Sequence, residues 1–298
     1  MTACAVAALG LTGLWLLPRP LLAARWTYRF PRAGIAAWLL LFPATAGALL
    51  AAGLSMALHL LPAGPGGLDG AGDDHVGGPA LDGVIAAAEA AVVLAGVVAV
   101  GVTVRRAGLA RRSHLRSVAL VARPAAHTGV LVVDAVQPAA YAVPGRPGAV
   151  VLTTAARDLL SRPELDAVLE HERAHLRARH DRLLTVAGTF AAAAPWLPAA
   201  RVVSRALRVL AEMHADDAAA RRTSPFTTAS ALVKLAGSAR PVVGLGAAAT
   251  DVAVRVERLL GHAGPGRRGP MVLGLAGLGV LAAVPLGVVA AAVVRAVG

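Results

Sequence analysis

Long apolar runs alternate with polar stretches along the chain. Residues 2–17, 33–61, 84–104 and 270–294 are almost free of charged side chains. A helix needs about 20 mainly apolar residues to cross a bilayer, so this pattern predicts four transmembrane helices, of which the first is short. Residues 62–82 are rich in Gly, Pro and Asp, which is typical of a flexible acidic loop outside a membrane.

The arginines predict how these helices are oriented. Several of them follow the first and third apolar runs, for example Arg25, Arg29 and Arg105. Basic loops face the cytoplasm, so we expect both termini outside and the region between the third and fourth runs inside. The composition agrees, with 57% hydrophobic residues and a net charge of +12. Because the topology accounts for the charge, we expect no direct nucleic-acid binding.

Between the third and fourth apolar runs, residues 105–262 show a mixed pattern. Runs at Ser117–Val121, Gly129–Asp134 and Ala149–Thr153 are typical of strands, and Pro144–Gly148 is typical of a hairpin turn. Helical periodicity extends from 162 to 184 and from about 199 to 222. These elements predict a cytoplasmic α+β domain with a small sheet, followed at 263–298 by a basic linker and the last predicted transmembrane helix.

Within the first of these helices lies the sequence H-E-x-x-H. Ser161 and Glu164 form a capping box at its start. His171 and His175 are four positions apart, so on a helix both imidazoles point to the same side and can bind one metal ion. Glu172 follows the first imidazole directly and is placed to act as general base. A chance occurrence on an amphipathic helix is the alternative interpretation.

Catalytic zinc usually has three protein ligands, and the best third candidate is Glu212 on the second helix. Asp216 lies one turn further on the same face and can accept a hydrogen bond from a ligand imidazole. His214 is the rival ligand, but it points to another side of the helix. The sequence therefore predicts one zinc ion per chain, bound by His171, His175 and Glu212.

These motifs resemble those of the BlaR/MecR family of integral-membrane metallopeptidases. H-E-x-x-H is followed by E-x-x-x-D, with Glu212 lying 37 positions after His175, and Tyr141–Thr154 is similar to the family's segment before the zinc helix. The resemblance implies a bacterial inner-membrane location, His171, His175 and Glu212 as zinc ligands, and Glu172 as catalytic acid and base. At one position the chain departs from the family: His180, followed by Asp181, stands where many relatives have Asp. No S-x-x-K motif is present, so we expect no penicillin-binding sensor domain.

Three further expectations concern the surroundings of the site. Residues 183–200 are apolar, but if they crossed a membrane Glu212 would lie on the side opposite His171. We therefore expect a re-entrant or interfacial segment there. The strand at Val150–Thr153 is a candidate edge for binding an extended peptide, with an ordinary core strand as the alternative. The Tyr141 hydroxyl is a candidate for polarising the substrate carbonyl, and a packing role for this side chain is the alternative.

Taken together, the sequence predicts a mainly α integral membrane protein with four transmembrane helices and a cytoplasmic α+β, zincin-like zinc metalloendopeptidase domain. Its partners would be the lipid bilayer and a protein or peptide substrate. The family resemblance implies a cytoplasmic transcriptional repressor as that substrate. The alternatives are an HtpX/Ste24-type quality-control metallopeptidase and a non-catalytic membrane signalling scaffold. The sequence does not predict the oligomeric state.

Overall fold

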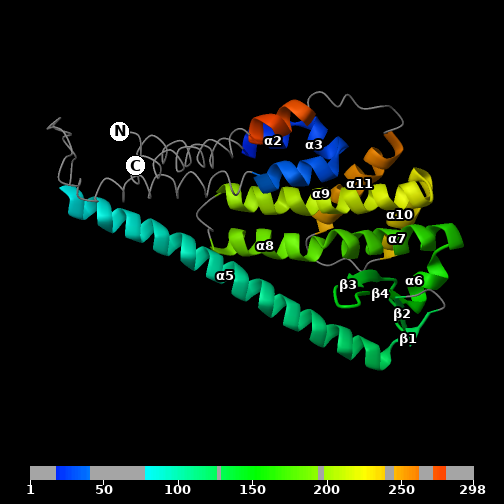
Figure 1. The fold of residues 1–298 in the computed structure, drawn as a ribbon. Coiled ribbons are helices and arrows are strands. Elements are labelled where there is room, and N and C mark those ends of the chain that lie inside the picture. Colours follow the sequence, from blue (N-terminus) through cyan, green and yellow to red (C-terminus); the bar gives the residue numbers. More distant parts are fainter. Residues whose placement is uncertain are drawn as a thin grey trace. The chain divides into compact units, whose positions relative to one another are not determined.

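The computed structural model describes residues 18–40, 78–125, 129–193, 198–238, 245–261 and 271–279 (Figure 1). Contacts divide the chain into two compact units. The first comprises Met1–Val100, Pro195–Val203 and Arg267–Gly298, and the second comprises Gly101–Ala194 and Ser204–Gly266. All the residues with predicted chemistry lie in the second unit.

The described part of the first unit is helical. It contains α2 (Pro18–Ala23), α3 (Arg25–Arg29) and the helical residues 31–40 and 271–279. Trp38 and Thr27 are its most buried large side chains, and the Thr27 hydroxyl donates to the Ala24 carbonyl at 2.7 Å. The long helix α5 (Gly78–Val121) begins in this unit and ends in the second.

The prediction of an integral membrane fold with four spanning helices is wrong for every helix that the structure describes. None of them is both long enough and apolar enough to cross a membrane. The predicted third span, 84–104, is the middle of the 44-residue helix α5, which continues through a series of arginines. Residues 2–17, 41–61 and 280–294 of the other predicted spans lie outside the described residues, as do 62–77 of the predicted external loop and both chain termini.

A small mixed sheet forms one side of the second unit. Its strands are β1 (Arg123–Pro124), β2 (Val130–Val133), β3 (Ala140–Val143) and β4 (Ala149–Thr153), in the order β1-β2-β4-β3. β2 pairs with β4 in parallel, whereas β1 with β2 and β3 with β4 pair antiparallel. β4 is buried throughout because it is central, so the prediction of an edge strand at Val150–Thr153 is wrong.

Two other strand predictions have different outcomes. β2 and the turn between β3 and β4 are confirmed. The run Ser117–Val121, predicted as a strand, is instead the last turn of α5. Its alternating apolar residues fit a helix equally well, since Val118 and Leu115 are three positions apart and both pack against Val143 and Val151 of the sheet.

The helix with H-E-x-x-H is α7 (Arg162–Ala178), preceded by the short α6 (Thr154–Leu159). The capping box is confirmed, with the Ser161 backbone N–H donating to Glu164 Oε2 at 2.8 Å. Leu169 is 1% exposed and packs with Val150 and Leu152, while Leu165 and Leu176 flank this core. Packing on the sheet therefore fixes the rotation of α7 about its axis and, with it, the direction of the motif side chains.

α7 does not continue to residue 184 as predicted. Arg179 adopts a left-handed conformation (φ 52°, ψ 41°) that ends the helix, and α8 (His180–Ala193) begins directly after it. The remaining helices of this unit are α9 (Pro198–Arg222), α10 (Pro225–Ser238) and α11 (Leu245–Gly261). α7 lies between the sheet and α9 (Figure 1), and it also contacts α10. The H-E-x-x-H motif is therefore on the helix that contacts both the sheet and the other helices of this unit.

Candidate metal centre

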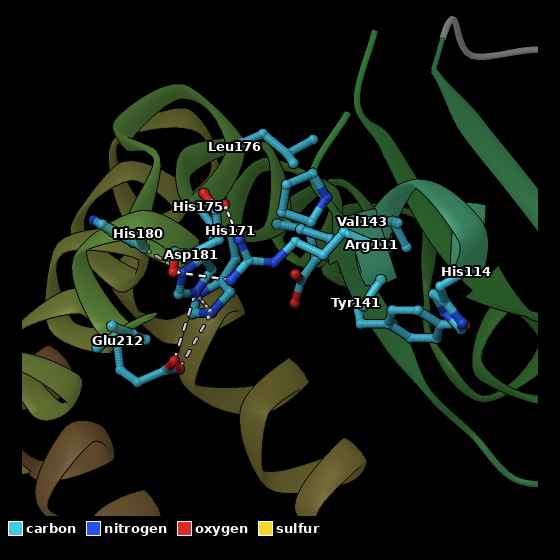
Figure 2. Close-up of a pocket in the computed structure, with 15 residues that line it drawn as sticks. Arg111, His114, Tyr141, Val143, His171, His175, Leu176, His180, Asp181 and Glu212 are labelled. Atoms are coloured by element: carbon cyan, nitrogen blue, oxygen red, sulfur yellow. Dashed lines mark hydrogen bonds and ion pairs between the residues drawn. The ribbon is translucent and has the colours of Figure 1, made fainter. Parts of the chain in front are cut away.

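The two imidazoles of the H-E-x-x-H motif lie side by side on α7. Their Nε2 atoms are 3.1 Å apart. α9 brings Glu212 to the same point, with Oε2 3.5 Å from His171 Nε2 and Oε1 3.6 Å from His175 Nε2 (Figure 2). The structure thus brings together the three predicted ligands from two helices. Residues 183–193 form the last eleven residues of α8 and do not separate Glu212 from the histidines.

The spacing of these atoms fits a zinc ion. Tetrahedral zinc holds nitrogen and oxygen ligands at about 2.0–2.1 Å, which places the ligand atoms roughly 3.3 Å from one another. One donor atom from each of His171, His175 and Glu212 lies within 4.8 Å of the others. The site therefore has the ligand types and the dimensions that zinc requires, with a side open to a cavity.

Glu172 lies beside the three candidate ligands and lines the same cavity. Its burial, supported by the charge of Glu212, raises its pKa to about 7, although His171, Arg255 and a backbone hydrogen bond from Ala142 act against this rise. A carboxyl group with a pKa near neutrality can accept and return a proton under ordinary conditions. Glu172 therefore has the properties of a general acid and base.

Asp216 supports His171 from behind. Its Oδ1 lies 3.1 Å from His171 Nδ1, and the side chain is 1% exposed. Because Nδ1 bonds to this carboxylate, Nε2 is left to face the metal position. Burial lowers the pKa of His171, but the hydrogen bonds to Asp216 and Glu212 outweigh burial and raise it to about 9. The predicted place of Asp216 beside a ligand imidazole thus agrees with the structure.

Arg255 on α11 is a member of the site that sequence reasoning missed. Its Nε and one terminal nitrogen donate to the two Asp216 oxygens at 2.7 Å, and its other terminal nitrogen lies 3.1 Å from Glu212 Oε2. Burial would raise the pKa values of both carboxylates, but Arg255 and His171 hold them at about 2. A signal was available: Arg255 lies three positions after Val252 and four before Leu259, on the apolar face of its helix.

A row of histidines extends from the other ligand. His180 Nδ1 lies 2.9 Å from His175 Nδ1, and His180 Nε2 lies 3.0 Å from His214 Nδ1. His180 is 2% exposed. Its burial, together with His175 and His214, lowers its pKa to about 3. His214 is therefore separated from the candidate metal position by the rings of His180 and His175, whereas Glu212 lies beside both candidate histidine ligands. Asp181 pairs with Arg111 at 2.9 Å.

The site opens into a cavity of about 570 Å³. One wall is the edge strand β3 with the following Pro144, and the other contains the candidate ligands. Tyr141 lies across the cavity from Glu212 and is directed toward His114, whose ring centroid is 5.9 Å away (Figure 2). This arrangement agrees with a packing role for Tyr141. A second cavity of about 190 Å³ reaches Glu172 from the side of α10.

Comparison with known proteins supports a peptidase. Residues 104–236 match the sequence model of peptidase family M48. A 70-residue segment is 40% identical to a protein named Protease HtpX homolog from Thermodesulfovibrio yellowstonii; it makes up 23% of this chain and a quarter of that relative's length. No solved structure matches the chain. The matches and the geometry support a metallopeptidase, whereas neither match supports the narrower BlaR/MecR assignment.

Proposed function

We propose that this protein is a zinc metalloendopeptidase. The observation that carries the proposal is the convergence of His171, His175 and Glu212 within 4.8 Å, next to a half-buried Glu172. When bound by these three side chains, zinc would supply a Lewis acid that polarises the scissile carbonyl. The match to peptidase family M48 across the segment that contains the three ligands gives independent support.

The proton transfers fall to Glu172. As a carboxylate it accepts a proton from the attacking water, and as a carboxylic acid it returns that proton to the departing amine, so that amide and water become acid and amine. Its pKa of about 7 lets it serve in both forms. Asp216 and Arg255 hold His171 and Glu212 in place throughout, since each of these two ligands bonds to at least one of them.

The edge strand β3 provides a place for an extended substrate. The Thr153 backbone N–H donates to the Ala139 carbonyl. In an antiparallel pair every second residue bonds to the partner strand, so the backbone groups of Ala140 and Ala142 point away from β4. A backbone hydrogen bond joins Ala142 to Glu172. A peptide added alongside β3 would therefore pass next to the catalytic carboxylate.

Of the two substrate classes considered, quality-control proteolysis of the HtpX type has more support. It agrees with the 40% identity to an HtpX homolog. Cleavage of a transcriptional repressor rests only on the BlaR/MecR resemblance. An experiment in cells distinguishes the two substrate classes. It measures the abundance of the repressor in strains that carry the wild type or Glu172→Gln, and equal abundance in both strains would contradict the repressor proposal.

The first experiment measures zinc content and casein cleavage with the purified protein. We expect about one zinc per chain. Glu172→Gln should retain the zinc but lose cleavage by a factor of about 10² to 10⁴. Asp166→Asn is the matched control, because this carboxylate lies exposed on the same helix and lines neither the cavity at the candidate ligands nor the one behind Glu172. If Glu172→Gln cleaved as fast as the wild type, the protein would be a scaffold that has kept the motif.

A further inference from the structure

Next to the metal centre lies a cavity of about 610 Å³ that is unusually rich in arginine. Its walls come from the C-terminal part of α5, the β3–β4 turn, and the junction of α7 and α8, all within the second unit. The six arginines that line it are Arg111, Arg112, Arg146, Arg177, Arg179 and Arg182, and Asp181 is the one acidic residue among them.

Most of this positive charge is not neutralised within the protein. Arg111 pairs with Asp181, and Arg177 pairs with Glu170. Within the described ranges, Arg112, Arg146, Arg179 and Arg182 have no carboxylate within ion-pair distance, and all four are exposed. Like charges gathered around one hollow repel each other and create a positive potential, which an anionic ligand relieves.

The backbone that carries these arginines is held firmly. Arg179 ends α7 in the left-handed conformation, and its N–H bonds to the His175 and Leu176 carbonyls. At its two glycines the β3–β4 turn packs closely against the helices: a Cβ at Gly145 would lie 2.8 Å from Leu115 Cδ2, and one at Gly148 would lie 3.2 Å from Leu176 Cδ2. The backbone positions of Arg146 and Arg179 are therefore set by the fold itself.

The arginine-lined cavity adjoins the cavity at the candidate metal site. Arg111, Pro144, Leu176 and Asp181 line both this cavity and the one that holds the candidate zinc ligands. The Ala142 backbone bonds to Glu172, β3 ends at Val143, and Arg146 lies in the turn that follows. At about 3.3 Å per residue, a peptide extended along β3 would reach the arginines roughly three to five residues from the bond that is cut.

We propose that the arginine-lined cavity binds an acidic segment of the substrate, so that the enzyme selects peptides with Asp or Glu about three to five residues to one side of the cleavage point. The inference rests on the proposed peptidase function, because it places the acidic segment relative to the scissile bond. An acidic peptide is favoured over other polyanions because the cavity shares its lining with the metal site and leads away from an open strand edge.

The test measures binding separately from cleavage. Fluorescein-labelled peptides that differ only in three Glu or three Gln residues are titrated into zinc-loaded Glu172→Gln protein, with and without Arg146→Gln and Arg182→Gln added. Arg123→Gln with Arg157→Gln is the matched control, since both arginines are exposed in the same unit and outside the cavity. The Glu peptide should bind about tenfold more tightly than the Gln peptide, and only the cavity variant should lose this preference.

Three other results would overturn the inference. They are equal binding of both peptides, a preference that survives in the cavity variant, and arginine-dependent binding of phosphatidylglycerol vesicles without any peptide preference. Wild-type cleavage of a mixed peptide library decides the proposed function independently. Cleavage without acid enrichment would leave the peptidase standing and the inference refuted. Absence of cleavage together with an arginine-dependent Glu preference would refute the peptidase and support the acidic-peptide site.

Discussion

Arg255 donates two hydrogen bonds of 2.7 Å to Asp216, which in turn lies 3.1 Å from the His171 imidazole. Arg255 is on α11, beyond residues 104–236 that match the peptidase family. The candidate metal centre therefore includes a side chain from a helix outside the matched segment. A two-point contact of this kind fixes the carboxylate plane, which a single charge does not do.

The first prediction concerns this contact. Arg255→Lys keeps the charge but loses the fork of donors, so Asp216 and Glu212 should be held less firmly. We expect zinc affinity to fall by about 10- to 100-fold, measured by competition with a chromogenic chelator. Arg258→Gln is the control, because Arg258 lies on the same helix one turn further on and pairs with Asp217 at 2.8 Å. Equal zinc affinity in both variants and the wild type would show that Arg255 does not support the metal ligands.

A second prediction concerns His180. If His175 binds zinc through Nε2, its proton is on Nδ1 and must be donated to His180 Nδ1, which leaves the Nε2 proton of His180 for His214. His180→Phe fills the space but provides no acceptor. We expect about tenfold weaker zinc binding with a smaller effect from His214→Gln. His180→Asn, which restores a carbonyl acceptor, should recover part of the loss, and a purely packing role would not give this recovery.

Glu164 gives a prediction about pH. Burial would raise its pKa, but hydrogen bonds from Lys234, Ser230 and Ser161 lower it to about 2, below the ordinary value of 4.5 for a glutamate. A lowered pKa stabilises the fold at pH values above 4.5, and this contribution is lost as the pH falls from 4.5 toward 2. After allowance for screening we expect about 1–2 kcal/mol. Urea unfolding at pH 7 and pH 3 should show a smaller pH dependence for Glu164→Gln than for the wild type.

The control for this experiment is Glu170→Gln. Glu170 lies on the same helix and pairs with Arg177, but it takes no part in the capping box or in the contact with α10. The pH dependence of its unfolding free energy should stay close to that of the wild type. If Glu164→Gln behaved in the same way, the link between α7 and α10 would not depend on this carboxylate.

Metal removal provides a fourth prediction. A ligand that binds only the folded state stabilises it in proportion to the logarithm of its concentration over Kd. Chelation should therefore lower the Tm of the wild type by several degrees, and excess zinc should restore it. His175→Ala should show little response to chelator or zinc. An identical response in this variant would place the stabilising metal at a different site.

Much of the metal site follows from local rules. The capping box at Ser161 and Glu164 sets the start of α7, and the four-residue spacing brings His171 and His175 to the same side. The same spacing places Asp216 one turn after Glu212 on α9, whose predicted range of 199–222 differs by one residue from the structure. These relationships depend on helix geometry alone, so the sequence was sufficient for them.

Other features depended on contacts between distant segments. The 84–104 run was predicted to span a membrane from its hydrophobicity, but it is part of a longer helix, and none of the described helices has a span's length and apolar character. The composition of Val150–Thr153 fits both an edge strand and a core strand. Its pairing with β2 on one side and β3 on the other makes it central. Strand order is set by long-range pairing, which a local pattern does not encode.

The sequence by itself determined the three candidate ligands, the candidate general base Glu172 and the partner of His171, because each follows from spacing on one helix or from the ligand preferences of zinc. The tertiary structure alone decided that Arg255 closes the site from α11, that His180 links His175 to His214, and that β3 forms the open edge. Each of these features depends on contacts between segments that are distant in the sequence. Arg255 and Asp216 are 39 residues apart, and His180 and His214 are 34 residues apart.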